Sequence, residues 1–439
     1  MISELETLVG SNSQIVNWEN IPSNWKEKIL RTVNSNDFST YLIYPHTQKA
    51  LSQVIKYASD RRLNLIPCGS GSKLSWGGLT KDISLLVSTK YLNRIIEHAV
   101  DDLTVTVESG ISLTELQDTL KQTGQFLALD PSYPEDATIG GIIATADSGS
   151  LRTRYGGVRD MLLGLSFVRA DGQIAKAGGR VVKNVAGYDL MKLFTGSYGT
   201  LGVICQATFR LYPLPEASTT AVLTGENEAI ATATKTLLAS TLTPTAADLL
   251  SASVVDRLQI GGSMGLIVRF QSISESVKEQ ITILESIAKQ VGLQTSLYED
   301  ADEEQLWQRL QEIMRSRSAS SETRSPASIE KITCKIGVLP NAAVETLNVL
   351  DGLGIIRASS GLGQLNLENS EEAIDIIKKM RSHCEHNRGF LTILEAPVTI
   401  KKQLDPWGYT GNALEIMRKI KKQFDPENIL SPDRFVGGI

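Results

Sequence analysis

A loop of glycine and serine constrains the fold of this chain more than any other segment. It reads Pro67-Cys68-Gly69-Ser70-Gly71-Ser72-Lys73 and continues to Gly77-Gly78. Because glycine has no Cβ, its backbone can take positive φ values, and successive N–H groups can converge on an anion. An ordinary glycine-rich turn is the alternative. The dinucleotide motif G-x-G-x-x-G would need glycine at Leu74, and no Gly-Lys-Ser/Thr follows, so neither a nicotinamide Rossmann domain nor a P-loop is predicted.

Length and charge limit the class of protein. The 439 residues predict two or three domains, and the net charge of −5 argues against nucleic acid or an anionic membrane as the main partner. The N-terminus lacks the pattern of a signal peptide, and no apolar run approaches the ~18 residues of a transmembrane segment. We therefore expect a soluble cytoplasmic protein. Its four cysteines are far apart, which predicts no disulfide, zinc or iron–sulfur site within the chain.

Strands and helices alternate around the glycine loop. An extended segment at 41–45, a helix with apolar positions at 51–58 and a strand at 63–66 form one unit, and the loop directly follows its second strand. Open α/β sheets bind ligands at this end of their strands. Ser112 and Glu115 predict a capped helix, and Asp171-Gly172 predicts a hairpin. Further strands are predicted at 84–88, 94–99, 103–107, 165–169, 173–176 and 201–212.

The pattern changes after Pro215, and we place a domain boundary near residue 216. The segments from 332 to 394 read as strand, helix, strand, strand, helix, strand, which is the ferredoxin-like order. A strand at 265–270 and the helix after it predict part of a similar preceding unit. The Ser- and Arg-rich segment 315–328 predicts a mobile loop. A last helix precedes Asp425-Pro426.

Two more glycine-rich segments, 137–160 and 183–204, lie in the same region. Together with the loop they resemble the FAD domain of the vanillyl-alcohol oxidase/p-cresol methylhydroxylase (PCMH-type) family over about residues 38–215. The motif Val-Lys-Asn-Val-Ala-Gly-Tyr-Asp at 182–189 is most similar to the FAD-binding E subunits of glycolate oxidase, and 424–434 is similar to the closing segment of the family.

This resemblance implies an α+β fold in which a PCMH-type FAD-binding domain of two subdomains is followed by a ferredoxin-like α+β cap domain. The expected division is an N-terminal extension at 1–37, the FAD-binding domain at 38–216, the cap or substrate domain at 217–400, and a C-terminal helix and tail at 401–439 that return to the FAD domain.

The resemblance also implies which residues bind FAD. The glycine loop would hold the pyrophosphate, the segments from Asp130 to Gly156 would line the flavin side, and Gly202 to Ile204 would meet the adenine end. The implied cofactor-binding residues are Pro67, Gly69, Ser70, Gly71, Ser72, Lys73, Asp130, Pro131, Thr138, Ile139, Gly140, Gly141, Ala144, Thr145, Ser148, Gly149, Tyr155, Gly156, Gly202, Val203 and Ile204.

The chain also departs from the family. Many members bind flavin covalently through a histidine near the pyrophosphate loop, whereas this loop has none, so non-covalent FAD is expected. Catalytic 2-hydroxy-acid dehydrogenases of the family have Gly-Ser-Glu-Gly where this chain has Gly196-Ser197-Tyr198-Gly199, and they carry an H-x-x-H-G-D-G-type run that is absent here. The catalytic residues are therefore unassigned, and no metal is expected.

Few side chains remain for acid–base chemistry or charge stabilisation. His46 and His98 are interpreted as structural, and His383 and His386, three apart on a helix, as solvated residues rather than a metal pair. Lys73 is a candidate partner for phosphate, with a structural role as the equal alternative. The candidate cations for a reduced flavin or a substrate carboxylate, each with a surface or ion-pair role as its alternative, are Arg152, Arg154, Arg159, Lys183 and Arg434.

The leading hypothesis is an FAD-binding subunit of a glycolate oxidase-type complex that oxidises a small 2-hydroxy acid. Its expected partners are a catalytic flavoprotein subunit and an iron–sulfur subunit. The missing histidine run suggests that this chain relays electrons or stabilises the complex. The alternatives are a self-sufficient FAD-dependent oxidase or dehydrogenase of an alcohol or sugar, and a flavin-free structural subunit.

Overall fold

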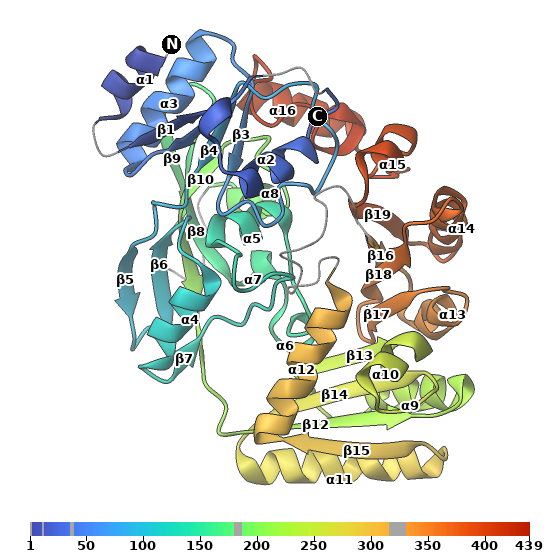
Figure 1. The fold of residues 1–439 in the computed structure, drawn as a ribbon. Helices are drawn as coiled ribbons and strands as arrows, with labels where there is room; N and C mark the ends of the chain where they lie inside the picture. The colour runs from blue at the N-terminus through green and yellow to red at the C-terminus, as the bar shows by residue number, and fades with distance from the viewer. Residues whose placement is uncertain (1, 11–12, 36–38, 180–186, 316–330) are drawn as a thin grey trace. The chain divides into compact units, whose positions relative to one another are not determined.

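A computed structural model describes residues 2–10, 13–35, 39–179, 187–315 and 331–439. The chain divides into two compact units (Figure 1). The first comprises 1–149, 156–214 and 409–439, and the second comprises 150–155 and 215–408. The predicted mobile loop from 316 onward, and 182–186 of the motif that includes Lys183, lie outside the described residues.

The first unit begins with a four-stranded sheet in the order β1-β2-β4-β3. β2, β3 and β4 are parallel, and β1 joins β2 antiparallel. Helix α3 packs on one face of this sheet and α2 on the other, through alternate strand residues such as Ile43 and Leu42. The elements are α1 (Ile2–Val9), β1 (Gln14–Asn17), η1 (Trp18–Asn20), α2 (Ser23–Leu30), β2 (Tyr41–Tyr44), α3 (Gln48–Asp60), β3 (Leu65–Cys68) and β4 (Leu85–Ser88).

A five-stranded antiparallel sheet, β5-β6-β10-β8-β9, forms the second half of this unit. Asp171-Gly172 makes the predicted hairpin between β8 and β9, and Ser112 caps α4 by accepting the N–H of Glu115. The elements are β5 (Ile95–Ala99), β6 (Thr104–Glu108), α4 (Leu113–Lys121), β7 (Gln125–Phe126), α5 (Ile139–Thr145), α7 (Val158–Met161), β8 (Leu162–Val168), β9 (Ile174–Gly178), α8 (Leu190–Phe194), β10 (Val203–Arg210) and β11 (Tyr212–Pro213).

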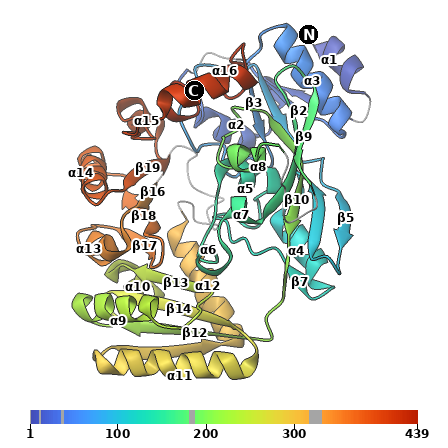
Figure 2. The ribbon, with the colours of Figure 1, turned by 180° about the vertical axis from the view of Figure 1, so that it is seen from behind.

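The C-terminal segment of the chain completes the first unit. Helix α16 (Leu414–Phe424) and the short η3 (Val436–Gly438) belong to it, and both views show α16, in red, beside β3 (Figure 1 and Figure 2). Leu65 of β3 donates its N–H to the carbonyl of Ile429, and Ser431 donates to the carbonyl of Leu65. The last residues of the chain therefore add a short bridge to the first sheet.

One eight-stranded sheet organises the second unit, in the order β15-β12-β14-β13-β17-β18-β16-β19. Its strands are β12 (Ala217–Thr224), β13 (Ala246–Leu250), β14 (Gly265–Ser272), β15 (Gln294–Glu299), β16 (Lys331–Gly337), β17 (Leu353–Arg357), β18 (Leu362–Glu368) and β19 (Phe390–Glu395). Its helices are α6 (Arg152–Tyr155), α9 (Asn227–Ala239), α10 (Ala252–Leu258), α11 (Ser274–Gln290), α12 (Asp300–Met314), η2 (Pro340–Ala342), α13 (Ala343–Asn348), α14 (Ala373–His386) and α15 (Val398–Gln403).

This sheet consists of two ferredoxin-like halves. In each half the strand that comes fourth in the chain lies beside the first, followed by the third and the second, and the halves join where β13 pairs antiparallel with β17. Ala221 and Leu223 of β12 face a core with α9, α11, α13 and α14, whereas Val222 faces a second core with α10 and α12. The predicted ferredoxin-like α+β fold is confirmed, and the preceding unit proves to be a complete copy of it.

The described residues include no helix that is both long enough and apolar enough to cross a membrane.

Candidate cofactor site

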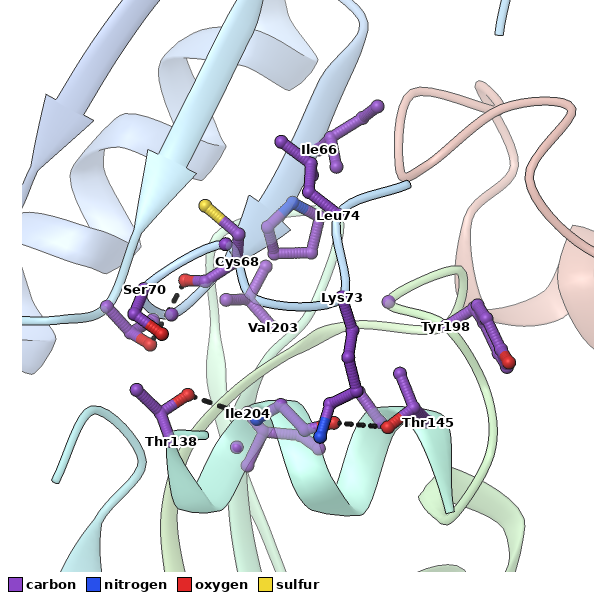
Figure 3. Close-up of a pocket in the computed structure, with 18 of the residues that line it drawn as sticks. Ile66, Cys68, Ser70, Lys73, Leu74, Thr138, Thr145, Tyr198, Val203 and Ile204 are labelled. Atoms are coloured by element: carbon purple, nitrogen blue, oxygen red, sulfur yellow. Dashed lines mark hydrogen bonds between the residues drawn. The ribbon is translucent and has the colours of Figure 1, made fainter. Parts of the chain in front are cut away.

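The glycine loop lies between β3 and β4 and forms one wall of a pocket in the first unit (Figure 3). Helix α5 and the segment 198–204 form the other walls. Of the predicted cofactor-binding residues, those that line this pocket are Pro67, Gly69, Ser70, Gly71, Ser72, Lys73, Thr138, Gly140, Gly141, Ala144, Thr145, Gly202, Val203 and Ile204. The arrangement of these residues along several segments suits an extended small molecule.

Consecutive backbone N–H groups are available in the loop. The N–H groups of Gly69 to Lys73 have no acceptor among the described residues. Two carbonyls of the loop are held instead: Ser88 Oγ donates to Gly69 O at 2.7 Å, and Lys28 Nζ donates to Ser70 O at 3.0 Å. Gly71 has a φ of +73°, which turns the chain in a way that other residues rarely adopt. A run of free N–H groups at the end of a strand fits a diphosphate.

Lys73, the predicted partner for phosphate, has a different partner in the structure. Its Nζ lies 2.9 Å from Oδ2 of Asp147, and both side chains are buried. Ser132 adds hydrogen bonds to Asp147 from its N–H and its hydroxyl. Burial by itself raises the pKa of Asp147, but Lys73 and the hydrogen bonds from Ser132 outweigh burial, so the pKa is lowered. The lysine charge is therefore neutralised within the protein.

Helix α5 reaches the pocket through its glycines and Thr145. Thr138 caps the helix, and its Oγ1 accepts the N–H of Gly141 at 3.4 Å. Ile139 donates its N–H to the carbonyl of Ile111, and Gly140 donates its N–H to the carbonyl of Ser109. These two N–H groups of the first turn are therefore not open to a ligand. The helix therefore forms a wall of the pocket, whereas the open N–H groups of the glycine loop are the groups suited to bind a diphosphate.

A turn at 196–199 rests on the end of α5. Gly196 donates its N–H to Ile143 O at 2.9 Å, and Tyr198 donates to Ala144 O at 2.8 Å. Tyr198 has a φ of +54° and lines the pocket. Burial, with the charge of Asp147 adding to it, raises the pKa of its phenol. The phenol therefore stays protonated at neutral pH.

Other predicted cofactor-binding residues do not line this pocket. Ile139 is fully buried, and Asp130 accepts the N–H of Gly149 through Oδ1 at 2.8 Å. Tyr155 belongs to the second unit, whereas Gly156 belongs to the first. The cofactor roles implied for these residues stay predictions, together with those of Pro131 and Ser148.

The pocket also has lining residues that the sequence did not single out for it. Cys68 is the last residue of β3 and Thr89 directly follows β4, so their closeness to the loop was a usable signal. Burial raises the pKa of the Cys68 thiol to about 12, which keeps it protonated. Arg434 is one of the candidate cations of the sequence, but no local signal places it beside the glycine loop, far from it along the chain. The remaining additional lining residues are Ile66, Leu74, Tyr198 and Gly199.

Of the candidate cations, only Arg434 lines this pocket among the described residues. Arg154 and Arg159 are exposed, Arg152 is half-buried, and Lys183 lies outside the described part of the chain. The guanidinium of Arg434 is buried and donates to the carbonyls of Leu74, Trp76 and Gly78. It therefore contacts the second half of the glycine loop.

The histidines have other surroundings. His46 stacks on Tyr91 with ring centroids 4.4 Å apart, and His98 Nε2 lies 2.9 Å from Gln125 Oε1. His383 Nε2 lies 3.1 Å from Thr346 Oγ1, and His386 is exposed. None of them lines the pocket, and the described residues contain no His, Cys, Asp and Glu group that could hold a metal.

Comparison with known proteins agrees with this site. Residues 39–178 match a family model described as an FAD binding domain, and 399–435 match the C-terminal domain of FAD linked oxidases. The glycolate oxidase subunit GlcD of Bacillus subtilis is 27% identical over 90% of this chain and 88% of its own. A mitochondrial D-lactate dehydrogenase [cytochrome] of Arabidopsis thaliana is 26% identical over 99% of this chain and 80% of its own.

The fold agrees as well. The crystal structure of p-cresol methylhydroxylase with substrate bound superimposes with a TM-score of 0.75 at 15% identity, over 99% of this chain and 95% of that one. FAD is the cofactor, as the sequence predicts. The chain thus matches an FAD binding domain and the C-terminal domain of FAD linked oxidases, and its fold is similar to that of a PCMH-type flavoprotein.

Proposed function

We propose that this chain is the FAD-binding subunit of a glycolate oxidase-type complex that oxidises a small 2-hydroxy acid. The similarity to a glycolate oxidase subunit and to a D-lactate dehydrogenase supports the substrate class, because both names refer to 2-hydroxy acids. When bound, FAD supplies this chain with a redox group that can accept electrons and pass them on. The observation that carries the proposal is a pocket whose glycine loop presents open N–H groups and whose described lining contains no histidine.

The residues of the chain would hold the cofactor mainly through backbone groups. The free N–H groups of 69–73 would bind the diphosphate, and Gly202 to Ile204 would meet the adenine end. Among the described residues of the lining, Cys68 has the one thiol, and its raised pKa leaves it protonated and a poor nucleophile. These features support non-covalent binding.

Substrate oxidation would take place on a partner flavoprotein. A hydroxyl proton must be removed as the hydride leaves, and neutral imidazole is the side chain best suited to accept it near pH 7. The histidines of this chain lie elsewhere, with His98 and His383 engaged by Gln125 and Thr346. We therefore assign electron transfer to this chain, with a catalytic flavoprotein subunit and an iron–sulfur subunit in the cytoplasm as its partners.

The visible spectrum of the purified chain tests this proposal. We expect flavin absorption bands, and acid precipitation should release the flavin into the supernatant because no covalent bond holds it. Anaerobic glycolate or D-lactate should leave the bands unchanged, while dithionite bleaches them as a control for a reducible flavin. Bleaching should follow when the partner subunits are added with the substrate.

Each other outcome has a distinct meaning. Rapid bleaching by glycolate or D-lactate alone would show a self-sufficient dehydrogenase and contradict the relay role. A spectrum without flavin bands would contradict both and leave only a structural role. Flavin that stays with the acid precipitate would overturn non-covalent binding.

A further inference from the structure

Arg434 lies under the second half of the glycine loop. Its Nη1 donates to the carbonyl of Gly78 at 2.8 Å, and its Nη2 donates to the carbonyls of Leu74 and Trp76. The side chain is 4% exposed, so these bonds form away from water. Charge-assisted bonds from one guanidinium to three carbonyls fix the orientation of those peptide groups.

The backbone around Arg434 also packs closely on the loop. Gly78 donates its N–H to the carbonyl of Arg434 at 3.0 Å. A Cβ at Gly77 would lie 2.5 Å from that carbonyl oxygen, and a Cβ at Gly78 would lie 2.2 Å from the carbonyl oxygen of Asp433. These two glycines therefore admit the C-terminal segment, whereas the earlier glycines of the loop line the pocket.

A buried ion pair anchors the segment that carries Arg434. Lys421 Nζ lies 2.6 Å from Asp425 Oδ2 and donates to the carbonyls of Thr200 and Leu430. Asp425 in turn accepts the N–H groups of Ile429 and Leu430. The guanidinium is thus held at a fixed place relative to β3 and the loop.

Arg434 brings a charged group to the wall of the pocket. Lys73 is paired with Asp147 at 2.9 Å, whereas Arg434 lines the pocket and donates to the carbonyls of Leu74, Trp76 and Gly78. Burial lowers the pKa of the guanidinium to about 10, with Tyr198 opposing this shift, so the group remains protonated at neutral pH. A positive charge in a low-dielectric wall attracts an anion more strongly than it would in water.

We propose that Arg434 is a positioning residue for the FAD diphosphate, which holds the loop in its binding form and places the positive charge beside the pocket. The polar contacts of the loop divide accordingly. N–H groups of its first half remain open for the phosphates, and carbonyls of its second half are turned to the guanidinium. The C-terminal segment is by this inference part of the cofactor site.

Cofactor-free full-length variants test this role through FAD, ADP and adenosine. Dissociation constants come from flavin fluorescence, with ADP and adenosine measured as competitors of FAD. Arg434→Met should weaken FAD and ADP by about 10- to 100-fold and adenosine by far less, because only the first two carry a diphosphate. Arg434→Lys keeps the charge and should recover most of the preference for ADP over adenosine.

Arg418→Met is the matched control, because Arg418 is on the same C-terminal segment but donates to Gly437 O and does not line the pocket. It should bind all three ligands as the wild type does. Equal losses for ADP and adenosine in Arg434→Met would show a merely structural role and overturn the proposal. Unchanged FAD affinity in Arg434→Met would also overturn the proposal. If Arg434→Met fails to fold, the Arg434→Lys variant decides, and the proposal is overturned if that variant does not prefer ADP to adenosine.

Discussion

Nζ of Lys73 lies 2.9 Å from Oδ2 of Asp147, and this buried pair joins the glycine loop to the segment that follows α5. The lysine stands in the loop where sequence patterns favour a phosphate contact, yet a carboxylate 74 positions later holds it. The pair fixes two walls of one pocket relative to each other. Its loss should affect the fold of the loop before it affects the charge in the pocket.

Breaking this ion pair should destabilise the first unit. Lys73→Met and Asp147→Asn each leave one group of the pair buried without its partner, and each should lower the free energy of unfolding by about 3 kcal/mol. Urea unfolding of the cofactor-free protein measures it. Glu415→Gln is the control, because Glu415 pairs with Lys419 in an exposed bridge with side chains 79% and 74% exposed. That change should stay within about 0.5 kcal/mol, and equal effects in both pairs would contradict the prediction.

Asp147 should also produce a loss of stability in acid. Its folded pKa is lowered, so it contributes stability above the pKa of an unfolded carboxyl, about 3.9, and loses it as pH falls through the folded value. Melting temperatures measured from pH 6 to pH 2.5 should fall more steeply for the wild type than for Asp147→Asn. Parallel curves for the two proteins would count against the assignment.

Asp248 should act in the opposite direction in the second unit. It is fully buried, Oδ2 accepts the hydroxyl of Ser150, and Oδ1 has no hydrogen-bond partner among the described residues. Burial raises its pKa, and the charge of Arg357 and the bond from Ser150 only partly offset this. The folded state therefore favours the protonated form, and stability is lost as pH rises above about 4.

Asp248→Asn should remove that loss. We expect the free energy of unfolding of the variant to be about 1 kcal/mol higher than that of the wild type at pH 7 and equal to it near pH 3. Asp256→Asn, on the exposed side of α10, is the control and should change nothing at either pH. A gain that is the same at both pH values would show that the charge of Asp248 is not its cause.

Gly71 should be sensitive to a single methyl group. Its φ is +73°, and a Cβ would lie 2.9 Å from Cζ3 of Trp25. The obstruction is therefore the indole ring of Trp25 beneath the loop. Gly124→Ala is the matched control, because its φ is +69° and nothing lies within 4 Å of the added Cβ.

Both alanines should cost about 1 kcal/mol from backbone strain, but only Gly71→Ala should weaken FAD, by about tenfold or more. Fluorescence titration of FAD measures the difference. Combining Gly71→Ala with Trp25→Leu should recover part of the affinity, since the ring is gone. If Gly71→Ala binds FAD as tightly as Gly124→Ala does, FAD binding does not depend on the packing of the loop on Trp25, and the prediction is wrong.

Two neighbouring lysines of α16 should differ in their effect on stability. Lys421 is 6% exposed, pairs with Asp425 and donates to the carbonyls of Thr200 and Leu430. Lys422 is exposed. Lys421→Met should lower the free energy of unfolding by about 3 kcal/mol and speed proteolysis of the C-terminal segment, while Lys422→Met should stay within about 0.5 kcal/mol. Similar values for the two would contradict the anchoring role.

Local patterns predicted much of the fold. The alternation at 103–107 appears as β6, the Asp171-Gly172 hairpin joins β8 to β9, and the capped helix after Ser112 is α4. These succeed because period, cap and turn residues act within a few positions of one another. The ferredoxin-like order was predicted for the same reason, since it depends on the sequence of elements rather than on their contacts.

Long-range partners escaped prediction. No helix was expected at 139–145, where two glycines disfavour one, but Thr138 and the carbonyls of Ser109 and Ile111 complete its first turn. Asp147 as the partner of Lys73, and Arg434 as a neighbour of Leu74, join residues 74 and 360 positions apart. Such pairs depend on the folded chain, and neither residue type identifies its partner in advance.

The bridge between Leu65 and the residues around Leu430 has a consequence for synthesis in the cell. A ribosome makes β3 long before its neighbour at 429–431, so the first sheet lacks this bridge while 215–408 can already fold as it emerges. The second unit is then the first part of the chain that can be completed. The wall of the flavin pocket that includes Arg434 forms only afterwards.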